Sequence, residues 1–342
     1  MTIDDLKRRI DTYEYEFLRD DKRFGNNLIL LGPGGTYAYG LEDEDSDLNV
    51  IGITLNSKRE VLTGKSFDRF YDESTDAVIF SFSKVISLLL KGNPATLDML
   101  GLKNEHYLYL SPIANELLFS KKMFISKKTV RAYERFIRKA LYSIMQKADG
   151  ENFKRDMERL VLENVNDIKQ DLTNRYTKMP IDSIYLYLGN SLRDINDIDI
   201  YMDMNLAHYP LRDYINLADD LRDTAEAFNK PGRRKGDAIT LENISKHCMH
   251  LVRLYLTLFD ILEQHDIITC REKDRDMLLD IKHGRFIGSD GKPNRGFFRL
   301  IDDYDKRLAV LKQRTTLPEE PDYEMIDLFV MSVNERIIRG EI

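Results

Sequence analysis

The residues whose types and spacing could do chemistry lie in the stretch LGPGGTYAYGLEDEDSDLNVIG, from Leu31 to Gly52. A glycine-rich turn comes first, and glycine lets the main chain adopt unusual angles and approach a ligand closely, because it has no Cβ. A strand then opens with Ser-Asp-Leu-Asn, in which Asp47 and Asn49 alternate with apolar residues and so share one face. This combination is typical of a site that handles phosphate groups and holds a divalent metal.

Nucleotidyl transfer is the reaction that fits these residues. It needs metal ions that bridge the triphosphate and activate the attacking hydroxyl, and such ions take carboxylate oxygens from adjacent strands. Asp47 is the first candidate ligand, and Asp76, which opens the strand AVIFSF, is its partner from a neighbouring strand. The turn at Gly34 and Gly35 would offer backbone N–H groups to the phosphates. On spacing alone, a tight hairpin with a solvated aspartate explains the same residues.

The elements that must position these residues can be read from short apolar runs. These predict strands over 28–32, 47–55 and 77–82, with a polar loop and a short helix between the last two. An amphipathic helix is predicted over 3–17, and two more helices for KVISLLLKG and, after Asn93-Pro94, for ATLDMLGL, since proline is tolerated in a first turn. Strands and helices in this order indicate a small α/β arrangement with a mixed sheet.

From about residue 111 the pattern becomes mainly helical. Helices are predicted over 127–148 with Ser126 as the N-cap, 151–177, 181–194, 241–264 and 274–282, with a strand or hairpin over 198–206 and a loop in GRFIGSDGKPNRG. The chain is therefore predicted to be an α+β protein with a catalytic domain over 1–110 and a large, mainly helical domain over 111–342.

Composition restricts the class of protein. The chain has 342 residues, of which 42% are hydrophobic and 32% charged, with a net charge of −7, so we expect a soluble globular protein of about two domains. The sequence contains no run of about 18 apolar residues, which a membrane-spanning helix would need. The N-terminus lacks the apolar core of a signal peptide. Cys248 and Cys270 are too few for a disulfide framework, which favours a reducing cytoplasm. The negative charge argues against coating long duplex nucleic acid, although local basic patches are present.

The segment GGTYAYG…SDLNVIGI resembles the signature of DNA polymerase β superfamily nucleotidyltransferases, and it is closest to a bacterial and phage group of predicted nucleotidyltransferases. Further similar blocks are DAVIFSFSKVISLLLKGNPATLDMLG, HYLYLSPIANELL, KHCMHLVRLYL, TCREKDRDMLLDIKHG and LPEEPDYEMIDLFVM, so the resemblance extends over most of the chain. It implies a small mixed-sheet catalytic domain, a nucleoside triphosphate as substrate, and Mg²⁺ or Mn²⁺ as the cofactor. By the same resemblance Gly35 and Thr36 match the nucleotide-binding turn, Asp47 the first metal carboxylate and Asp76 the third.

Asn49 departs from this pattern, because the family has a second aspartate there. An amide is a weaker ligand for a hard cation and removes a full negative charge. The asparagine could be an inactivating substitution made to trap substrate, the mark of a natural inactive member, or part of a working variant that uses Asp45 or Asp43 instead. We favour the first. The usual Ile-Arg-Gly is also replaced, by Val50-Ile51-Gly52, which removes a positive group.

Basic residues on the helix over 241–264 could hold the triphosphate. Lys246, His250 and Arg253 are spaced to share a face away from its apolar side, and arginine binds phosphate in a bidentate manner. Alternatively, His250 is a packed core histidine and Arg253 pairs with Asp260 or another carboxylate. Zinc is not favoured, because His247 and His250 lack a third ligand at metal spacing.

Two further basic groups lie in the block TCREKDRDMLLDIKHG, which the resemblance places at the border of the cleft. Arg271 and Lys282 are the residues expected to contact phosphate. Spacing alone indicates only the charged start of a helix.

Arg131, Arg135 and Arg138 share one face of the helix over 127–148. With tyrosines nearby, this stripe could guide an acceptor nucleic acid through phosphate neutralisation and stacking. An ordinary solvated face explains it equally.

We therefore expect a two-metal nucleotidyltransferase in which an acceptor hydroxyl attacks the α-phosphate and pyrophosphate leaves. The first choice of acceptor is a nucleic-acid 3′ end or a growing oligonucleotide, with antiviral defence as the context that the resemblance suggests. The second is a protein hydroxyl, including self-modification on tyrosine or serine. The rival from another class is a catalytically dead regulator that binds nucleotide or a partner protein, as Asn49 suggests.

Overall fold

The computed structural model describes residues 3–43, 46, 48–148, 183–190, 198–215, 217–218, 221 and 243–342. These residues form two compact units. The first unit contains Met1–Ile137, Cys248–Phe286 and Asn294–Ile342, and the second contains Arg138–His247 and Ile287–Pro293. The domain boundary predicted at residue 110 therefore falls inside the first unit.

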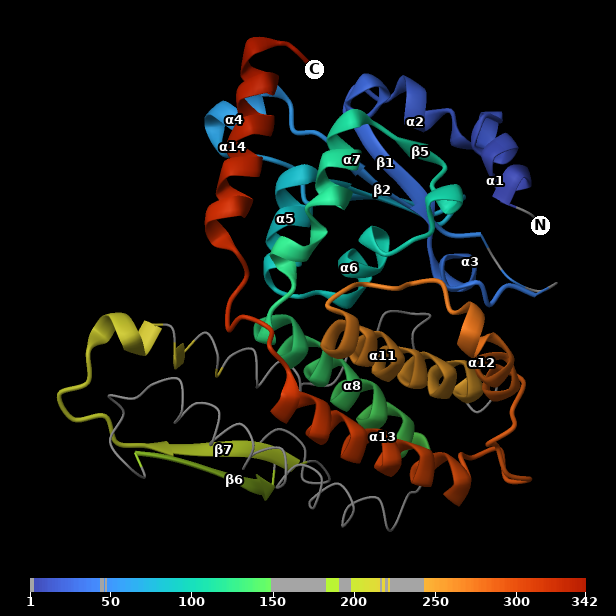
Figure 1. Ribbon diagram of the computed structural model, residues 1–342, viewed down its shortest axis with the longest axis vertical. Helices are drawn as coiled ribbons and strands as arrows, with labels where there is room; N and C mark the ends of the chain where they lie inside the picture. The colour runs from blue at the N-terminus through green and yellow to red at the C-terminus, as the bar shows by residue number, and fades with distance from the viewer. Residues whose placement is uncertain are drawn as a thin grey trace. The chain divides into compact units, whose positions relative to one another are not determined.

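A five-stranded mixed sheet forms the centre of the first unit (Figure 1). Its strands lie in the order β3-β4-β2-β1-β5; they are β1 (Leu28–Pro33), β2 (Val50–Thr54), β3 (Arg69–Asp72), β4 (Ala77–Ser81) and β5 (Tyr109–Leu110). Only β2 and β4 run parallel, and the other pairs are antiparallel. The predicted α+β class with a mixed sheet is confirmed.

The register of this sheet brings three strand ends to one edge. Pro33 at the end of β1 lies opposite Val50 at the start of β2, and Val50 pairs with Ala77 at the start of β4. The residues that follow β1 and those that precede β2 and β4 must therefore lie at the same edge of the sheet.

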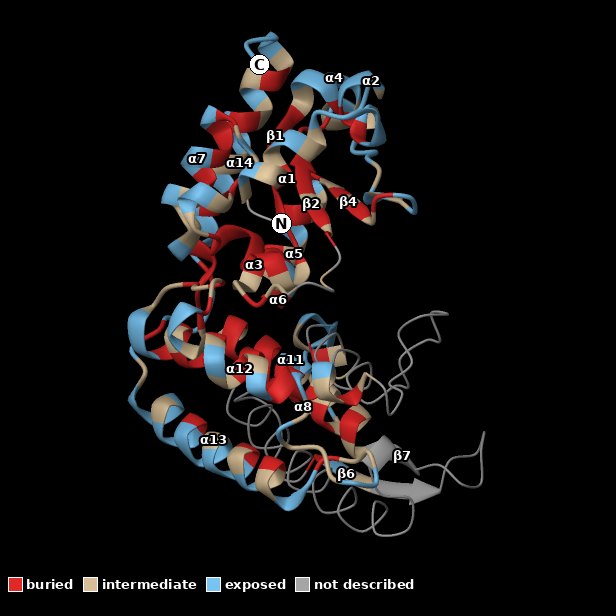
Figure 2. Ribbon diagram, turned by 90° about the vertical axis from the view of Figure 1, so that its right-hand side faces the viewer, coloured by how far each residue is buried: buried red, intermediate tan, exposed pale blue. Residues whose placement is uncertain are grey.

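Helices cover both faces of the sheet (Figure 1). On one face, α1 (Ile3–Ile10) and α2 (Phe17–Asp20) bring Leu6 and Leu18 into a core with Val50 and Ile79. On the other, α5 (Phe82–Leu90) packs against β2 and β4, and α7 (Pro112–Phe119) against β1. In Figure 2 the buried residues continue from β1, β2 and β4 into the short helices α3 (Gly35–Tyr39) and α6 (Pro94–Leu100).

Local signals explain where several of these helices start. Ser81 caps α5 by accepting from the Lys84 N–H, and Asn93 caps α6 with Pro94 in its first turn. Ser57 and Glu60 form a capping box on α4 (Lys58–Thr63).

The C-terminal part is mainly helical, as predicted. It contains α8 (Lys127–Ala148), α11 (Ile244–Gln264), α12 (Arg275–Lys282), α13 (Arg295–Arg314) and α14 (Tyr323–Arg339). Short 3₁₀ turns lie at η1 (Tyr13–Tyr15), η2 (Gly25–Asn27), η3 (Asn104–His106), η4 (Lys121–Phe124) and η5 (Glu272–Asp274). Within the described ranges, no helix is long and apolar enough to cross a membrane.

Three sequence-based predictions of elements differ from the structure. The helix predicted over 181–194 is wrong: it contains the strand β6 (Ile184–Asn190), which pairs with β7 (Ile198–Met204). In β6 aromatic residues alternate, and the Tyr187 ring stacks on that of Tyr201 at 5.7 Å. The strand β3 lies in the segment predicted to be a loop, and the helix predicted over 3–17 ends at Ile10 and resumes as η1 and α2. The helix predicted over 151–177 lies outside the described residues.

Candidate active site

The candidate site is the edge of the sheet where β1 ends and β2 and β4 begin. Asn49 precedes Val50 and Asp76 precedes Ala77, and these two strand starts are paired in parallel. The Gly34 N–H donates to the Asn49 carbonyl at 2.8 Å, which ties the glycine turn to the same edge. The structure thus brings Gly34, Asn49 and Asp76 together, as the sequence predicted.

The two glycines of the turn have different surroundings. A Cβ on Gly34 would lie 2.9 Å from Cδ1 of Ile51 and 3.5 Å from the Asn49 Cβ, so a side chain there would displace the end of Ile51. Gly35 has φ +58, in the left-handed region that other residues avoid. Thr36 follows in the first turn of α3, where backbone N–H groups have no partner within the helix.

Asp76 also has a left-handed backbone, with φ +49, a conformation that aspartate tolerates better than most residues. Across the β3–β4 hairpin, hydrogen bonding by its carboxylate, and then its negative charge, raises the pKa of Tyr71. Tyr71 was not among the residues selected from the sequence, although a strand-turn-strand signal in RFYDESTDAVIFS could have placed it opposite the residues after Asp76.

Asp47 lies outside the described residues, and among those that the structure describes no group of three or more His, Cys, Asp or Glu could hold a metal ion. The described donors at the edge are the amide oxygen of Asn49 and the carboxylate of Asp76. These are oxygen ligands of the kind that Mg²⁺ takes, so they fit such an ion in type. They supply one negative charge where two carboxylates would supply two.

Asp43, one of the alternative ligands considered for the position of Asn49, is already engaged. Lys282 Nζ donates to Asp43 Oδ2 at 2.6 Å, and the Ser46 hydroxyl donates to its other oxygen at 2.7 Å. The hydrogen bond from Lys282 and then the one from Ser46 hold the pKa of Asp43 well below its usual range. Asp45, the other alternative, lies outside the described residues.

The block around α12 holds the loop that leads from the glycine turn toward Ser46. The Arg271 N–H donates to the Tyr39 carbonyl at 2.8 Å, and Arg275 Nη2 donates to the Glu42 carbonyl at 3.2 Å. Lys282 Nζ adds a long contact to the Leu41 carbonyl at 3.4 Å. The expectation that this block borders the site is met through backbone contacts, whereas the Lys282 charge faces a carboxylate.

The Arg271 guanidinium is turned inward. Its side chain is 4% exposed and bonds Asp260 Oδ2 at 2.5 Å, the Thr257 hydroxyl at 2.8 Å and the Ile268 carbonyl at 2.8 Å. An arginine held in this way stabilises the core and presents no free face to a phosphate.

Arg253 is buried too, at 1% exposure. Its guanidinium pairs with Asp98 at 3.0 Å and lies 3.8 Å from the ring centre of Tyr39, whose hydroxyl donates to the same carboxylate at 3.1 Å. The structure therefore supports the alternative in which Arg253 pairs with a carboxylate, and that carboxylate is Asp98 rather than Asp260. Burial raises the pKa of Tyr39, so this phenol stays protonated as a donor.

The three basic residues predicted on α11 do not share one exposed face. Lys246 and His250 are exposed, whereas Arg253 lies in the core. His250 Nδ1 lies 3.4 Å from Nη2 of Arg253. It is not the packed core histidine of the alternative interpretation.

The basic stripe on α8 is partly covered. Arg131, whose side chain is 17% exposed, lies 3.5 Å from Glu319 and from Glu320. Arg135 and Arg138 are half-buried.

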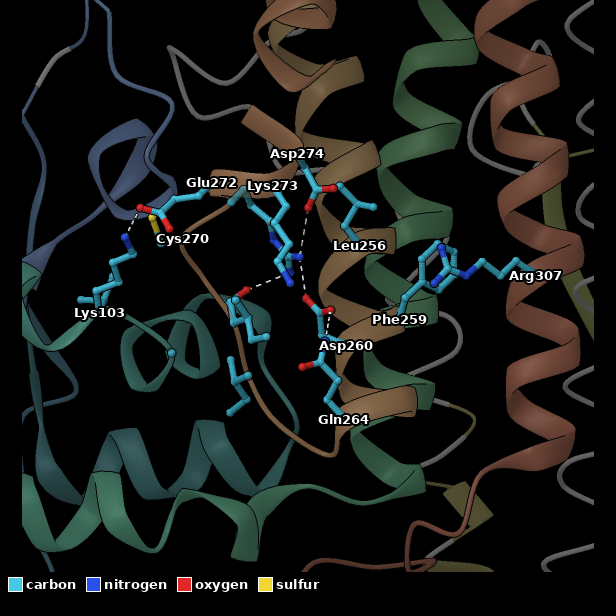
Figure 3. A pocket seen from close by; sticks show the side chains of 15 residues that line it. Lys103, Leu256, Phe259, Asp260, Gln264, Cys270, Glu272, Lys273, Asp274 and Arg307 are labelled. Carbon is cyan, nitrogen blue, oxygen red and sulfur yellow. Dashed lines mark hydrogen bonds and ion pairs between the residues drawn. The ribbon is translucent and has the colours of Figure 1, made fainter. Parts of the chain in front are cut away.

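A cavity of about 350 Å³ lies away from the sheet edge, beside α11 and η5 (Figure 3). In its wall, Asp260 and Asp274 both pair with Arg271. Arg307 lies over the Phe259 ring, as Figure 3 shows, and its guanidinium carbon is 4.2 Å from the ring centre. Lys103 pairs with Glu272 at its rim. The charges lining this cavity largely neutralise one another, and neither Asn49 nor Asp76 is among them.

Comparison with known families places the sheet edge in context. Residues 10–160 match the family model RlaP, described as the RNA repair pathway DNA polymerase beta family. The match includes the glycine turn, Asn49, Asp76 and the Asn93-Pro94 segment, and it ends before the blocks around Arg253 and Arg271. Searches of curated proteins and of solved structures found no match. Over residues 10–160, which contain the glycine turn and the mixed sheet, the chain is therefore similar to a polymerase β-type nucleotidyltransferase family.

Proposed function

We propose that this chain moves a nucleoside monophosphate from a nucleoside or deoxynucleoside triphosphate to an acceptor hydroxyl, with loss of pyrophosphate. The observation that carries the proposal is the meeting of the glycine turn with Asn49 and Asp76 at one sheet edge, inside the region that matches the family. Backbone N–H groups at Gly35 and Thr36 would bind the phosphates, whereas the Gly34 N–H, which donates to the Asn49 carbonyl, would position the turn.

The cation would be held by Asp47, Asn49 and Asp76. When bound, Mg²⁺ or Mn²⁺ would neutralise the triphosphate and polarise the reacting oxygens. The exposed Lys246 and His250 are proposed as additional nucleotide contacts. For Arg253, Arg271 and Lys282 we propose an indirect role: they hold α3 and the loop that follows it, because their charges are taken up by Asp98, Asp260 and Asp43.

A nucleic-acid 3′-hydroxyl is the proposed acceptor. The family description names an RNA repair pathway, and antiviral defence is the context that the sequence resemblance suggests. Arg131, with Arg135 and Arg138 beside it, would guide the strand. Arg131 would exchange Glu319 and Glu320 for phosphate, because both of its ion pairs are long, at 3.5 Å.

Asn49 favours a second candidate, a regulator that binds nucleotide without turning it over. The described donors at the sheet edge carry one negative charge fewer than the family pattern, and a hard cation binds more weakly to such a set.

One experiment separates the two candidates. The unchanged chain and the Asn49→Asp, Asp76→Asn and Asn49→Asp/Asp47→Ala variants are incubated with α-labelled nucleoside triphosphates, Mg²⁺ or Mn²⁺, and RNA or DNA oligonucleotides. Pyrophosphate release and labelled oligonucleotide are measured. We expect Asn49→Asp to release more pyrophosphate than the unchanged chain, and Asp47→Ala to abolish the gain.

The same measurement can refute the proposal. No turnover in either the unchanged chain or the Asn49→Asp variant contradicts catalysis, and nucleotide binding without product then supports the regulator. Turnover that survives Asp47→Ala and Asp76→Asn contradicts the roles given to these carboxylates.

A further inference from the structure

Helix α14 is held against the first unit by one of its faces. Ile326, Val333 and Ile337 are buried on that face, and the Phe329 ring packs against Phe82 of α5, with 6.0 Å between the ring centres. In Figure 1, α14 runs beside α4, which it contacts. These contacts fix which side of α14 faces the core, and therefore which side faces outward.

The outer side of α14 carries an exposed apolar row. Met325, Leu328 and Met331 follow one another at intervals of three residues, so they lie along one side of the helix. Their exposed fractions are 51%, 62% and 58%, and Leu62 on the neighbouring α4 is 63% exposed. Single exposed apolar residues are ordinary on a folded protein, whereas neighbouring ones that form a patch mark a surface that another molecule covers.

The charges at the two ends of this row are opposite in sign. Glu324 lies seven residues before Met331, and Arg339 lies eight residues after it. Both side chains are exposed. Arg339 has only long contacts with exposed carboxylates, at 3.6 Å to Glu335 and 3.9 Å to Glu341, and such surface pairs contribute little to stability. The Arg339 guanidinium is therefore available to a carboxylate of another molecule.

An antiparallel copy of the same helix has the complementary pattern. In a two-fold interface the same surface of both copies is used, so the surface must be complementary to itself. A two-fold axis beside Met331 brings the two Met331 side chains together, with Leu328 of each copy on either side. The same axis places Glu324 of each copy near Arg339 of the other, because the two residues lie at similar distances from Met331.

We propose that the outer side of α14 is the surface through which two copies of this chain associate, with their α14 helices antiparallel. The apolar row provides the affinity, because burial of apolar surface is the main favourable contribution to association. The charges fix the orientation, since a parallel pair would place Glu324 against Glu324. The inference does not depend on the proposed nucleotidyl transfer, because no residue of the sheet edge takes part in it.

The test measures the mass of the full chain in solution by sedimentation equilibrium, over a range of concentrations up to high micromolar. The unchanged chain is compared with Leu328→Lys and with Val310→Lys, a matched control on α13, where Val310 is 44% exposed. Glu324→Arg and Arg339→Glu are measured singly and together. Thermal unfolding confirms that each variant is folded.

We expect the unchanged chain to form a dimer whose dissociation constant rises roughly tenfold or more in Leu328→Lys and stays the same in Val310→Lys. Each single charge reversal should weaken the dimer, and the double variant should restore it, because both partners of each contact are then reversed. A chain that stays monomeric overturns the inference, whichever other protein this surface then binds. A dimer that Leu328→Lys leaves intact, or a double reversal as weak as the single ones, also overturns it.

Discussion

At the sheet edge, polar side chains stand beside glycines and are partly open, whereas around α6 and α11 they are packed against one another. Asn49 and Asp76 are both half-buried. Asp98 and Arg253 are almost fully buried and pair with each other, and Asp98 also accepts from Tyr39. The same residue types are thus available to a ligand in one region and stabilise the fold in the other. The difference lies in whether another residue of the chain already pairs with the charged group.

The buried network links the glycine turn to a segment outside the matched region. Tyr39 lies on α3 directly after the glycine turn, Asp98 on α6 and Arg253 on α11. Their contacts with one another hold α3 in place, and with it the glycine turn that precedes α3. Asp98 Oδ1 and Arg253 Nε have no hydrogen-bond partner in the structure, so this network is costly to desolvate and has little tolerance for further loss.

The largest effect should come from breaking the buried pair. Asp98→Leu leaves the Arg253 guanidinium buried without its counter-charge, which should cost about 3–5 kcal/mol of unfolding free energy. Urea denaturation measures this. The exposed pair Asp303–Lys306 is the control, and Asp303→Leu should change stability by less than ~0.5 kcal/mol. Equal losses in the two variants would contradict the contrast between the regions.

A smaller loss is expected from Lys282→Met, which removes the cation that holds Asp43 and the loop before Ser46. A hydrogen bond to a charged group is worth about 1.5–3 kcal/mol. Because the pKa of Asp43 is lowered in the folded state, this stabilisation is fully present above the unfolded carboxyl pKa of about 4 and is lost as pH falls below it. Urea denaturation at neutral and acidic pH should therefore show the two proteins converging in acid. A difference that stays constant with pH would rule out the Asp43 charge as its source.

The smallest effect on stability, yet the sharpest on function, is expected from Gly35→Ala. Both Gly35, with φ +58, and Gly64, with φ +64, are left-handed, and alanine at either should cost about 1–2 kcal/mol. A Cβ added at Gly64 would meet no atom within 4 Å, and this residue lies outside the site. Denaturation should show similar losses, while fluorescent-nucleotide titration should show weaker binding for Gly35→Ala alone. Equal nucleotide binding in the two variants would exclude the turn as the phosphate site.

The local signals in the sequence were sufficient for several elements. The apolar run at 28–31 and the cap at Asn93-Pro94 produced β1 and α6 where they were expected, because burial and capping act within a few residues. The glycine turn is bonded to Asn49, and Asp76 precedes the strand beside β2. The tyrosine-rich strand β6 was mistaken for a helix, since a short apolar run with aromatic residues suits both structures until its partner β7 is known.

The pairing of charges could not be read from the sequence. Arg253, Arg271 and Lys282 were expected to meet phosphate, and each faces a carboxylate from another segment of the chain. Helical spacing places a charge on a face but contains no information about what that face packs against.

The sequence by itself determined the family region, the need for glycine at the turn and the absence of a negative charge at Asn49, because these depend on residue type and local spacing. Tertiary structure decided which polar groups remain accessible at the sheet edge and which are paired with other residues in the core. Strand register and helix packing bring distant residues to within hydrogen-bonding distance, and only that proximity determines whether a charge is already neutralised or still available to a ligand.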